Sequence, residues 1–206
     1  MIRRLVLTLS LTGCSTVATE EPPFEVSLRE GAFEVRDYPA MIAAEVTVGG
    51  ERGSAVNAGF RLLAGYIFGG NTRRQSIAMT APVVQAQAEP ETIAMTAPVI
   101  QSGGPSAWVI RFIMPRAYSL ATLPAPNDAR VRLTPVPASR MAVVRFSGLG
   151  REEDIKERTG ELEAFVAANR LRAAGPPSLA RYNPPWTPWF MRRNEVMIPL
   201  EVETGR

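Results

Sequence analysis

The order of strand-like and helix-like segments constrains the fold of this chain more than any other feature of the sequence. Two segments have the apolar spacing of an amphipathic helix, residues 54–68 and residues 151–172. Alternating apolar segments, which are typical of strands, precede and follow each of them. The order of strands, helix and strands therefore occurs twice. It predicts one α+β domain made of two similar halves.

Each predicted helix has an apolar stripe and a recognisable start. The stripe of the first helix consists of Val56, Phe60, Leu63 and Ile67. Ser54 precedes this stripe and is the predicted N-terminal cap. The second helix begins with three acidic residues, 152–154, which interact favourably with the helix dipole, and we expect Arg170 and Arg172 in its last turn.

A near-repeat in the middle of the chain predicts two neighbouring strands. The segments IAMTAPVVQ (residues 77–85) and IAMTAPVIQ (residues 93–101) differ at one position. Because side chains alternate along a strand, we expect Met79 and Met95 to point to the same side of one sheet. The remaining predicted strands are residues 33–38, 41–48, 108–114, 131–136, 141–146, 179–183 and 195–200.

The absence of histidine excludes several kinds of functional site. The chain has 0 histidines and 1 cysteine, Cys14, so it cannot build a Ser-His-Asp triad, a Cys/His zinc site or a histidine-ligated haem. The net charge is +3, and the arginines form only short pairs, so we expect no nucleic-acid binding. The strand carboxylates show no spacing typical of catalysis, and we expect neither an enzyme nor a metal site.

The N-terminus has the pattern of a lipoprotein export signal. Arg3 and Arg4 precede an apolar run that ends in Leu-Thr-Gly-Cys at Cys14, which resembles the bacterial lipobox. The run is too short to span a bilayer, which takes about 20 residues. We expect a signal peptide (residues 1–13), a lipidated tether (14–23) and a domain (24–206) in the cell envelope, on the periplasmic side of the outer membrane. The alternative is an ordinary apolar N-terminus with an incidental cysteine.

Several segments resemble the SOUL haem-binding family, in the family's order. They are FEVRDY (33–38), FRLLAGYIFGGN (60–71), IAMTAPV (77–83), FIMP (112–115), LPAPND (123–128), YN (182–183) and RNEV (193–196). The resemblance implies a distorted β-barrel of two similar halves flanked by two helices. It also implies binding of haem or a related tetrapyrrole in an apolar cleft, without an enzymatic step. Some relatives have a proposed iron-ligating histidine where this chain has Asp37. Here haem must therefore be held without histidine ligation.

The candidate ligand-binding residues come from three segments. A haem needs an apolar slot and arginines for its two propionates. The candidates are Ala58, Arg61, Leu62 and Tyr66 of the first helix, Met79 and Met95 of the repeats, and Trp186 and Trp189 of a proline-rich loop that we expect to expose its aromatic side chains. For each of them, ordinary core packing or solvent exposure is the alternative. The rival function is a ligand-free interaction module that docks a partner through residues 186–190.

Overall fold

The computed structural model describes residues 20–87, 107–183 and 186–202. In chain order its elements are β1 (Glu25–Glu30), β2 (Phe33–Tyr38), β3 (Met41–Gly49), α1 (Arg52–Ile67), β4 (Val83–Gln87), β5 (Ala107–Ile113), β6 (Arg132–Val136), β7 (Ser139–Ser147), α2 (Glu152–Ala168), β8 (Ser178–Arg181), the 3-10 helix η1 (Trp189–Met191) and β9 (Arg193–Leu200). The strands form one sheet in the order β1-β2-β7-β9-β8-β4-β5-β3-β6, with every pair antiparallel. The predicted α+β class is confirmed.

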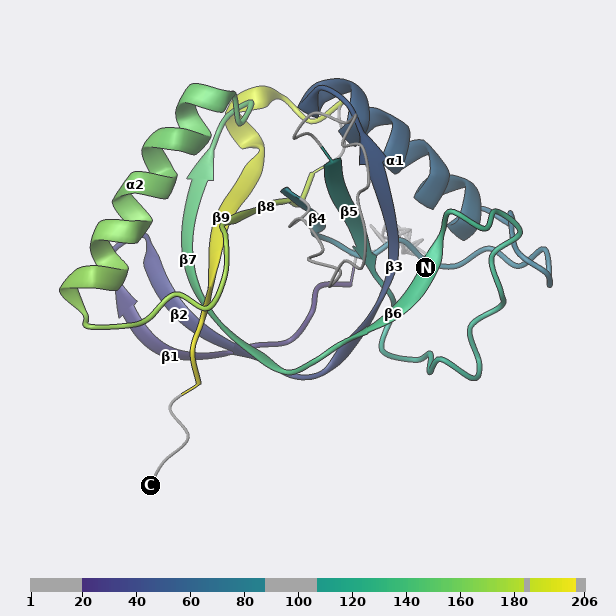
Figure 1. Ribbon diagram of the computed structural model, residues 1–206, viewed down its shortest axis with the longest axis horizontal. Helices are drawn as coiled ribbons and strands as arrows, with labels where there is room; N and C mark the ends of the chain where they lie inside the picture. Colours follow the sequence, from purple (N-terminus) through teal and green to yellow (C-terminus); the bar gives the residue numbers. More distant parts are fainter. Residues whose placement is uncertain (1–19, 88–106, 184–185, 203–206) are drawn as a thin grey trace, which may run out of the picture.

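The sheet curls into a half-barrel with both helices on its outer side (Figure 1). Strand alternation divides the side chains between the two faces. On β9, Val196, Ile198 and Leu200 pack in a core cluster with α2, whereas Glu195 and Met197 face the concave side. A second core cluster joins α1 to β3 and β5. Each half of the sheet is therefore closed on the outside by one helix.

Helix α1 buries only half of the predicted stripe, namely Leu63 and Ile67. Its buried residues are Ala55, Gly59, Leu63, Tyr66 and Ile67. A Cβ at Gly59 would lie 2.7 Å from Cδ1 of Ile110, so this glycine permits the close approach of α1 to β5. The helix is rotated accordingly, and Val56 and Phe60 are only half-buried. The predicted Ser54 cap is also wrong, because the Glu51 carboxylate accepts from the backbone N–H groups of Gly53 and Ser54 at 3.0 and 3.2 Å.

Two further boundaries differ from the prediction. Helix α2 ends at Ala168, before Arg170 and Arg172, although its acidic first turn is as predicted. The first IAMTAPV segment becomes a strand only at Val83. Upstream of it, Pro82 has no N–H for a ladder, and the Thr80 hydroxyl donates to the carbonyl of Ile113. The second copy, with Met95, lies outside the described residues. The prediction that the two copies are neighbouring strands is nevertheless wrong for β4, because β5 and β8 already pair with its two edges.

Residues Glu20–Phe24, which we call the strap, cross the concave face before β1. The Glu20 carbonyl accepts from the Ala81 N–H at 3.0 Å, and Glu21 pairs with Arg193 at 3.0 Å. The Phe24 ring lies 5.4 Å from that of Tyr38. The strap, part of which was expected to belong to the tether (residues 14–23), therefore already contacts the domain. No helix among the described residues has the length and apolarity needed to cross a membrane.

Candidate ligand-binding site between the helices

The outer face of the sheet has an uncovered region between the two helices. α1 covers β3 and β5 and α2 covers β7 and β9, which leaves the neighbouring strands β4 and β8 between them. Two cavities of about 250 and 210 Å³ lie there, and Gln85 lines both. We call this region the groove. The N-termini of α1 and α2 lie at its upper end (Figure 1), and Arg52 and Glu152 from these two ends line the same cavity.

Arginines with few counter-charges line the groove. The Arg52 guanidinium donates to Oε1 of Gln85 at 3.3 Å, and that of Arg181 donates to the carbonyl of Gly150 at 3.1 Å. Among the described residues, neither forms an ion pair with a carboxylate. Burial lowers the pKa of Arg52, against the weaker opposing charges of Glu152 and Glu51.

The cationic charges of the groove repel one another. Burial lowers the pKa of Arg181, and the charges of Arg52 and Arg192 lower it further. The charge of Arg181 is thus opposed by the charges of two other guanidinium groups. A bound anion would remove that repulsion and would supply acceptors for the arginine donors. The groove is therefore suited to a carboxylate or another oxyanion.

Orphaned donors in the groove indicate the same ligand chemistry. Three buried nitrogen atoms, Nε2 of Gln85, Nε1 of Trp108 and Nε of Arg181, have no hydrogen-bond partner in residues 20–87, 107–183 and 186–202. Gln85 is only 3% exposed. A buried donor without an acceptor costs about 1–3 kcal/mol. An acceptor-rich group in the groove would recover part of this cost.

An exposed aromatic segment lies in the chain between two residues that line the groove, Asn183 and Arg192. Trp189 of this segment lines a separate cavity beside the start of α2. Residues 186–191, which we call the aromatic loop, cross the top of the molecule between the helix N-termini (Figure 1). Their exposed fractions are 83% for Trp186, 62% for Trp189, 61% for Phe190 and 64% for Met191. Apolar side chains this exposed are typical of a binding surface. The loop was predicted to be exposed, and this is confirmed.

The structure places the other sequence candidates away from the groove. Tyr66 is buried under α1, where its hydroxyl donates to the carbonyl of Pro124 at 2.9 Å. Leu62 and Met79 pack against the same core, Ala58 is half-buried, and Arg61 is exposed. Cys14 and Met95 lie outside the described residues.

The residues of α1 that do line the groove are Arg52, Val56, Asn57 and Phe60. Sequence reasoning placed Val56 and Phe60 in the core, because the spacing of apolar residues does not show which edge of a helix stripe is buried. Arg52, Gln85 and Arg181 were missed. They lie far apart in the sequence. The register of β4 with β8 brings Gln85 and Arg181 near each other, and the packing of α1 against the sheet adds Arg52.

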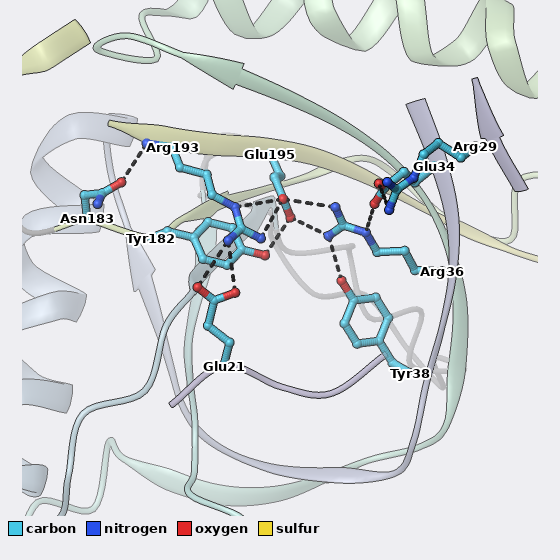
Figure 2. Close-up of polar contacts among 9 residues, drawn as sticks. All are labelled: Glu21, Arg29, Glu34, Arg36, Tyr38, Tyr182, Asn183, Arg193 and Glu195. Atoms are coloured by element: carbon cyan, nitrogen blue, oxygen red, sulfur yellow. Dashed lines mark hydrogen bonds and ion pairs between the residues drawn. The ribbon is translucent and has the colours of Figure 1, made fainter. Parts of the chain in front are cut away.

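A second polar cluster lies on the concave face and is centred on Glu195 (Figure 2). The Glu195 side chain is 0% exposed. Its carboxylate accepts from Arg36 at 2.8 and 3.2 Å, from Arg193 at 2.9 and 3.0 Å and from the Tyr182 hydroxyl at 2.6 Å. Burial by itself would raise the pKa of Glu195. The hydrogen bonds from Arg36 and Tyr182 and the charges of both arginines outweigh burial and lower it.

This cluster is saturated with internal partners. Arg36 also donates to Glu34 at 2.6 Å, and Arg193 also pairs with Glu21 of the strap. In the sheet, β7 lies between β2 and β9, so the backbones of β2 and β9 do not pair with each other. The Arg36–Glu195 side-chain pair connects these two strands across β7. We interpret the cluster as a structural cross-link of the concave face.

Comparison with known proteins identifies a family. A family model described as "SOUL heme-binding protein" matches residues 19–199. A sequence search of curated proteins found no match.

Comparison of the fold gave solved structures of low sequence identity. The C-terminal domain of EcmrR has a TM-score of 0.60 at 11% identity, over 86% of this chain and 98% of that one. A hydrolase from Listeria innocua has a TM-score of 0.56 at 13% identity, over 85% and 94% of the two chains. An uncharacterised conserved protein from the same organism has a TM-score of 0.55 at 15% identity, over 82% and 92%. At these identities the likeness is one of fold.

Proposed function

Since the chain belongs to the SOUL heme-binding protein family, we propose that it binds haem or a related tetrapyrrole, and that the groove and the aromatic loop form the site. The observation that carries this proposal is the combination of Arg52 and Arg181, which form no ion pair within the described part of the chain, with an exposed aromatic segment. A tetrapyrrole with two propionates presents the complementary chemistry, an apolar plate with carboxylates at one edge.

Different side chains would bind different parts of such a ligand. Arg52 and Arg181 would hold propionates, and the orphaned donors of Gln85 and Trp108 would add hydrogen bonds. Trp186 and Trp189 would cover the apolar ring. When bound, haem would supply its own iron chemistry. The protein contributes binding and orientation, and we propose that it is not an enzyme.

The side chains do not favour ligation of an iron by the protein. The sequence contains 0 histidines. A tyrosinate can ligate ferric iron, but burial raises the pKa of Tyr38, Tyr66 and Tyr182 and so disfavours their phenolate forms. In this account, the binding free energy comes from burial of the apolar ring and from the interactions of its carboxylates with the arginines.

Iron-free protoporphyrin IX is expected to bind nearly as tightly as haem, because little of the affinity comes from the metal. The measurement is a titration of the purified domain with each ligand, followed in the Soret band. Tyr38→Phe and Tyr182→Phe should leave the haem dissociation constant within about twofold of wild type. Tight haem binding that is lost with iron-free porphyrin, and abolished by one Tyr→Phe change, would contradict this account.

The alternative function rests on the same aromatic loop. Its exposed side chains also suit a protein partner that needs no small ligand. If neither haem nor protoporphyrin bound at micromolar concentration, the interaction-module hypothesis would replace tetrapyrrole binding.

We further propose that the protein is anchored to a membrane of the cell envelope through a lipid on Cys14, which lies outside the described residues. The supporting observation is the Leu-Thr-Gly-Cys ending of the arginine-led apolar run. Between Cys14 and the strap at Glu20, a fully extended chain reaches roughly 20 Å, so the domain would lie close to the membrane surface. Cys14→Ser should move the protein from the membrane to the soluble fraction, with loss of the lipid mass. Unchanged fractionation and mass would contradict the anchor.

A further inference from the structure

The concave face encloses a second cavity, separated from the groove by the sheet. Its volume is about 110 Å³, and it lies between the strands and the strap. Its apolar wall includes Phe24, Met41, Val84, Ile113, Met141 and Met197. Three of these are methionines, whose flexible, polarisable side chains adapt to ligands of different shape.

The polar groups around this cavity already have partners. Arg111 pairs with Glu45 at 2.5 Å. The Tyr38 hydroxyl accepts from Arg36 at 3.2 Å, and the Tyr182 hydroxyl donates to Glu195 at 2.6 Å (Figure 2). A charged ligand would have to displace one of these partners. An uncharged apolar ligand would not, so the cavity is suited to a different chemical class from the groove.

The strap separates this cavity from a larger and more open one. The neighbouring cavity has a volume of about 500 Å³ and also lies against Pro22, Met41 and Ile113. The Glu21–Arg193 pair that fastens the strap is partly exposed, with side-chain exposures of 43% and 20%. Such pairs contribute little to stability. A small shift of the strap would therefore join the two cavities.

We propose that the concave face is a second binding site, for a small, uncharged, hydrocarbon-rich molecule that enters when the strap shifts. Apolar cavities in proteins take up apolar molecules in preference to water. Hydrogen bonds within the Glu195 cluster occupy the hydroxyls of Tyr38 and Tyr182 in the cavity wall. Glu21 is one of the residues that fasten the strap to the domain. The site does not depend on tetrapyrrole binding.

The test uses N-phenyl-1-naphthylamine, an uncharged dye whose emission rises in apolar surroundings. Wild-type protein should give a saturable rise in emission. Val84→Phe places a ring in the cavity and should weaken dye binding at least tenfold, while porphyrin affinity stays at the wild-type level. Val26→Phe, the same change at an exposed position of β1, is the matched control and should bind dye as wild type does. If Val84→Phe does not fold, Ser139→Leu replaces it in the test, because this substitution fills the same cavity from β7 and should weaken dye binding in the same way.

The strap is tested by Glu21→Gln, which removes the ion pair with Arg193. Dye association, followed by stopped flow, should become severalfold faster than in wild type. No saturable emission in wild type, or unchanged dye binding in both cavity-filling variants, would overturn the proposal. Because porphyrin binding is measured separately on the same proteins, failure of this site and failure of the groove are distinguishable.

Discussion

Replacing Arg52 and Arg181 together with glutamine is expected to weaken porphyrin binding roughly tenfold to a hundredfold. A hydrogen bond to a charged group contributes about 1.5–3 kcal/mol, and about 1.4 kcal/mol corresponds to a factor of ten in affinity. Arg52 and Arg181 line the same groove, so the losses of binding free energy from the two single substitutions need not add. Titration in the Soret band measures the effect.

The same substitutions should not destabilise the ligand-free protein. They remove a repulsion that lowers the pKa of Arg181, so thermal unfolding should occur at the wild-type temperature or above it. Loss of binding would then not reflect unfolding. Arg61→Gln is the matched control, because Arg61 is an exposed arginine on α1 that sequence reasoning favoured. If Arg61→Gln weakened binding as much as the double variant did, the site would lie on the face of α1 predicted from the sequence.

Replacing Glu195 with alanine is expected to lower the free energy of unfolding by about 3–5 kcal/mol. Removing one partner of a buried ion pair takes the counter-charge from the other partner. Here Arg36 and Arg193 would both lose Glu195, and each would keep only its less buried second partner, Glu34 or Glu21. Denaturant unfolding followed by circular dichroism measures the loss. Glu161→Gln breaks a partly exposed pair with Arg158 and should cost less than about 1 kcal/mol. Equal losses in the two variants would contradict the structural role of the Glu195 cluster.

The contribution of Glu195 should also depend on pH. Its pKa is lower in the folded protein than the ordinary value of 4.5, so the folded state favours the charged form. The stabilisation is therefore complete above that ordinary value and decreases as the pH falls toward the lower folded pKa. The difference in unfolding free energy between wild type and Glu195→Ala should narrow over this acidic range. A difference that widened on acidification would contradict the sign of the shift.

The sequence predicted those parts of the fold that depend on local pattern. The strand FEVRDY, the acidic start of α2 and the exposed aromatic loop were each visible in contiguous residues. Strand β1 was missed, because EVSLRE is largely exposed and has no continuous apolar face. The rotation of α1 was missed because it depends on Gly59 meeting Ile110 on β5, and no local pattern records that contact.

The candidate site was predicted only in part for the same physical reason. Trp186 and Trp189 were found because Pro184, Pro185 and Pro188 argue against a regular central strand in their segment. A fourth proline counted in the same argument, Pro199, lies within β9. Arg52, Gln85 and Arg181 come from three different elements, and sheet register and the packing of α1 decide that they meet. The Glu195–Arg36 contact spans 159 residues of sequence, which places it beyond any local spacing.

Tryptophan fluorescence tests the central claim most directly, because all 3 tryptophans of the chain lie at the groove or in the aromatic loop. Protoporphyrin IX and its dimethyl ester would be titrated into the wild-type protein. We predict saturable quenching by the free diacid at micromolar concentration. The ester keeps the apolar ring but loses both carboxylates, and it should bind at least tenfold more weakly. Equal binding of the two compounds, or binding of the diacid without tryptophan quenching, would contradict the account.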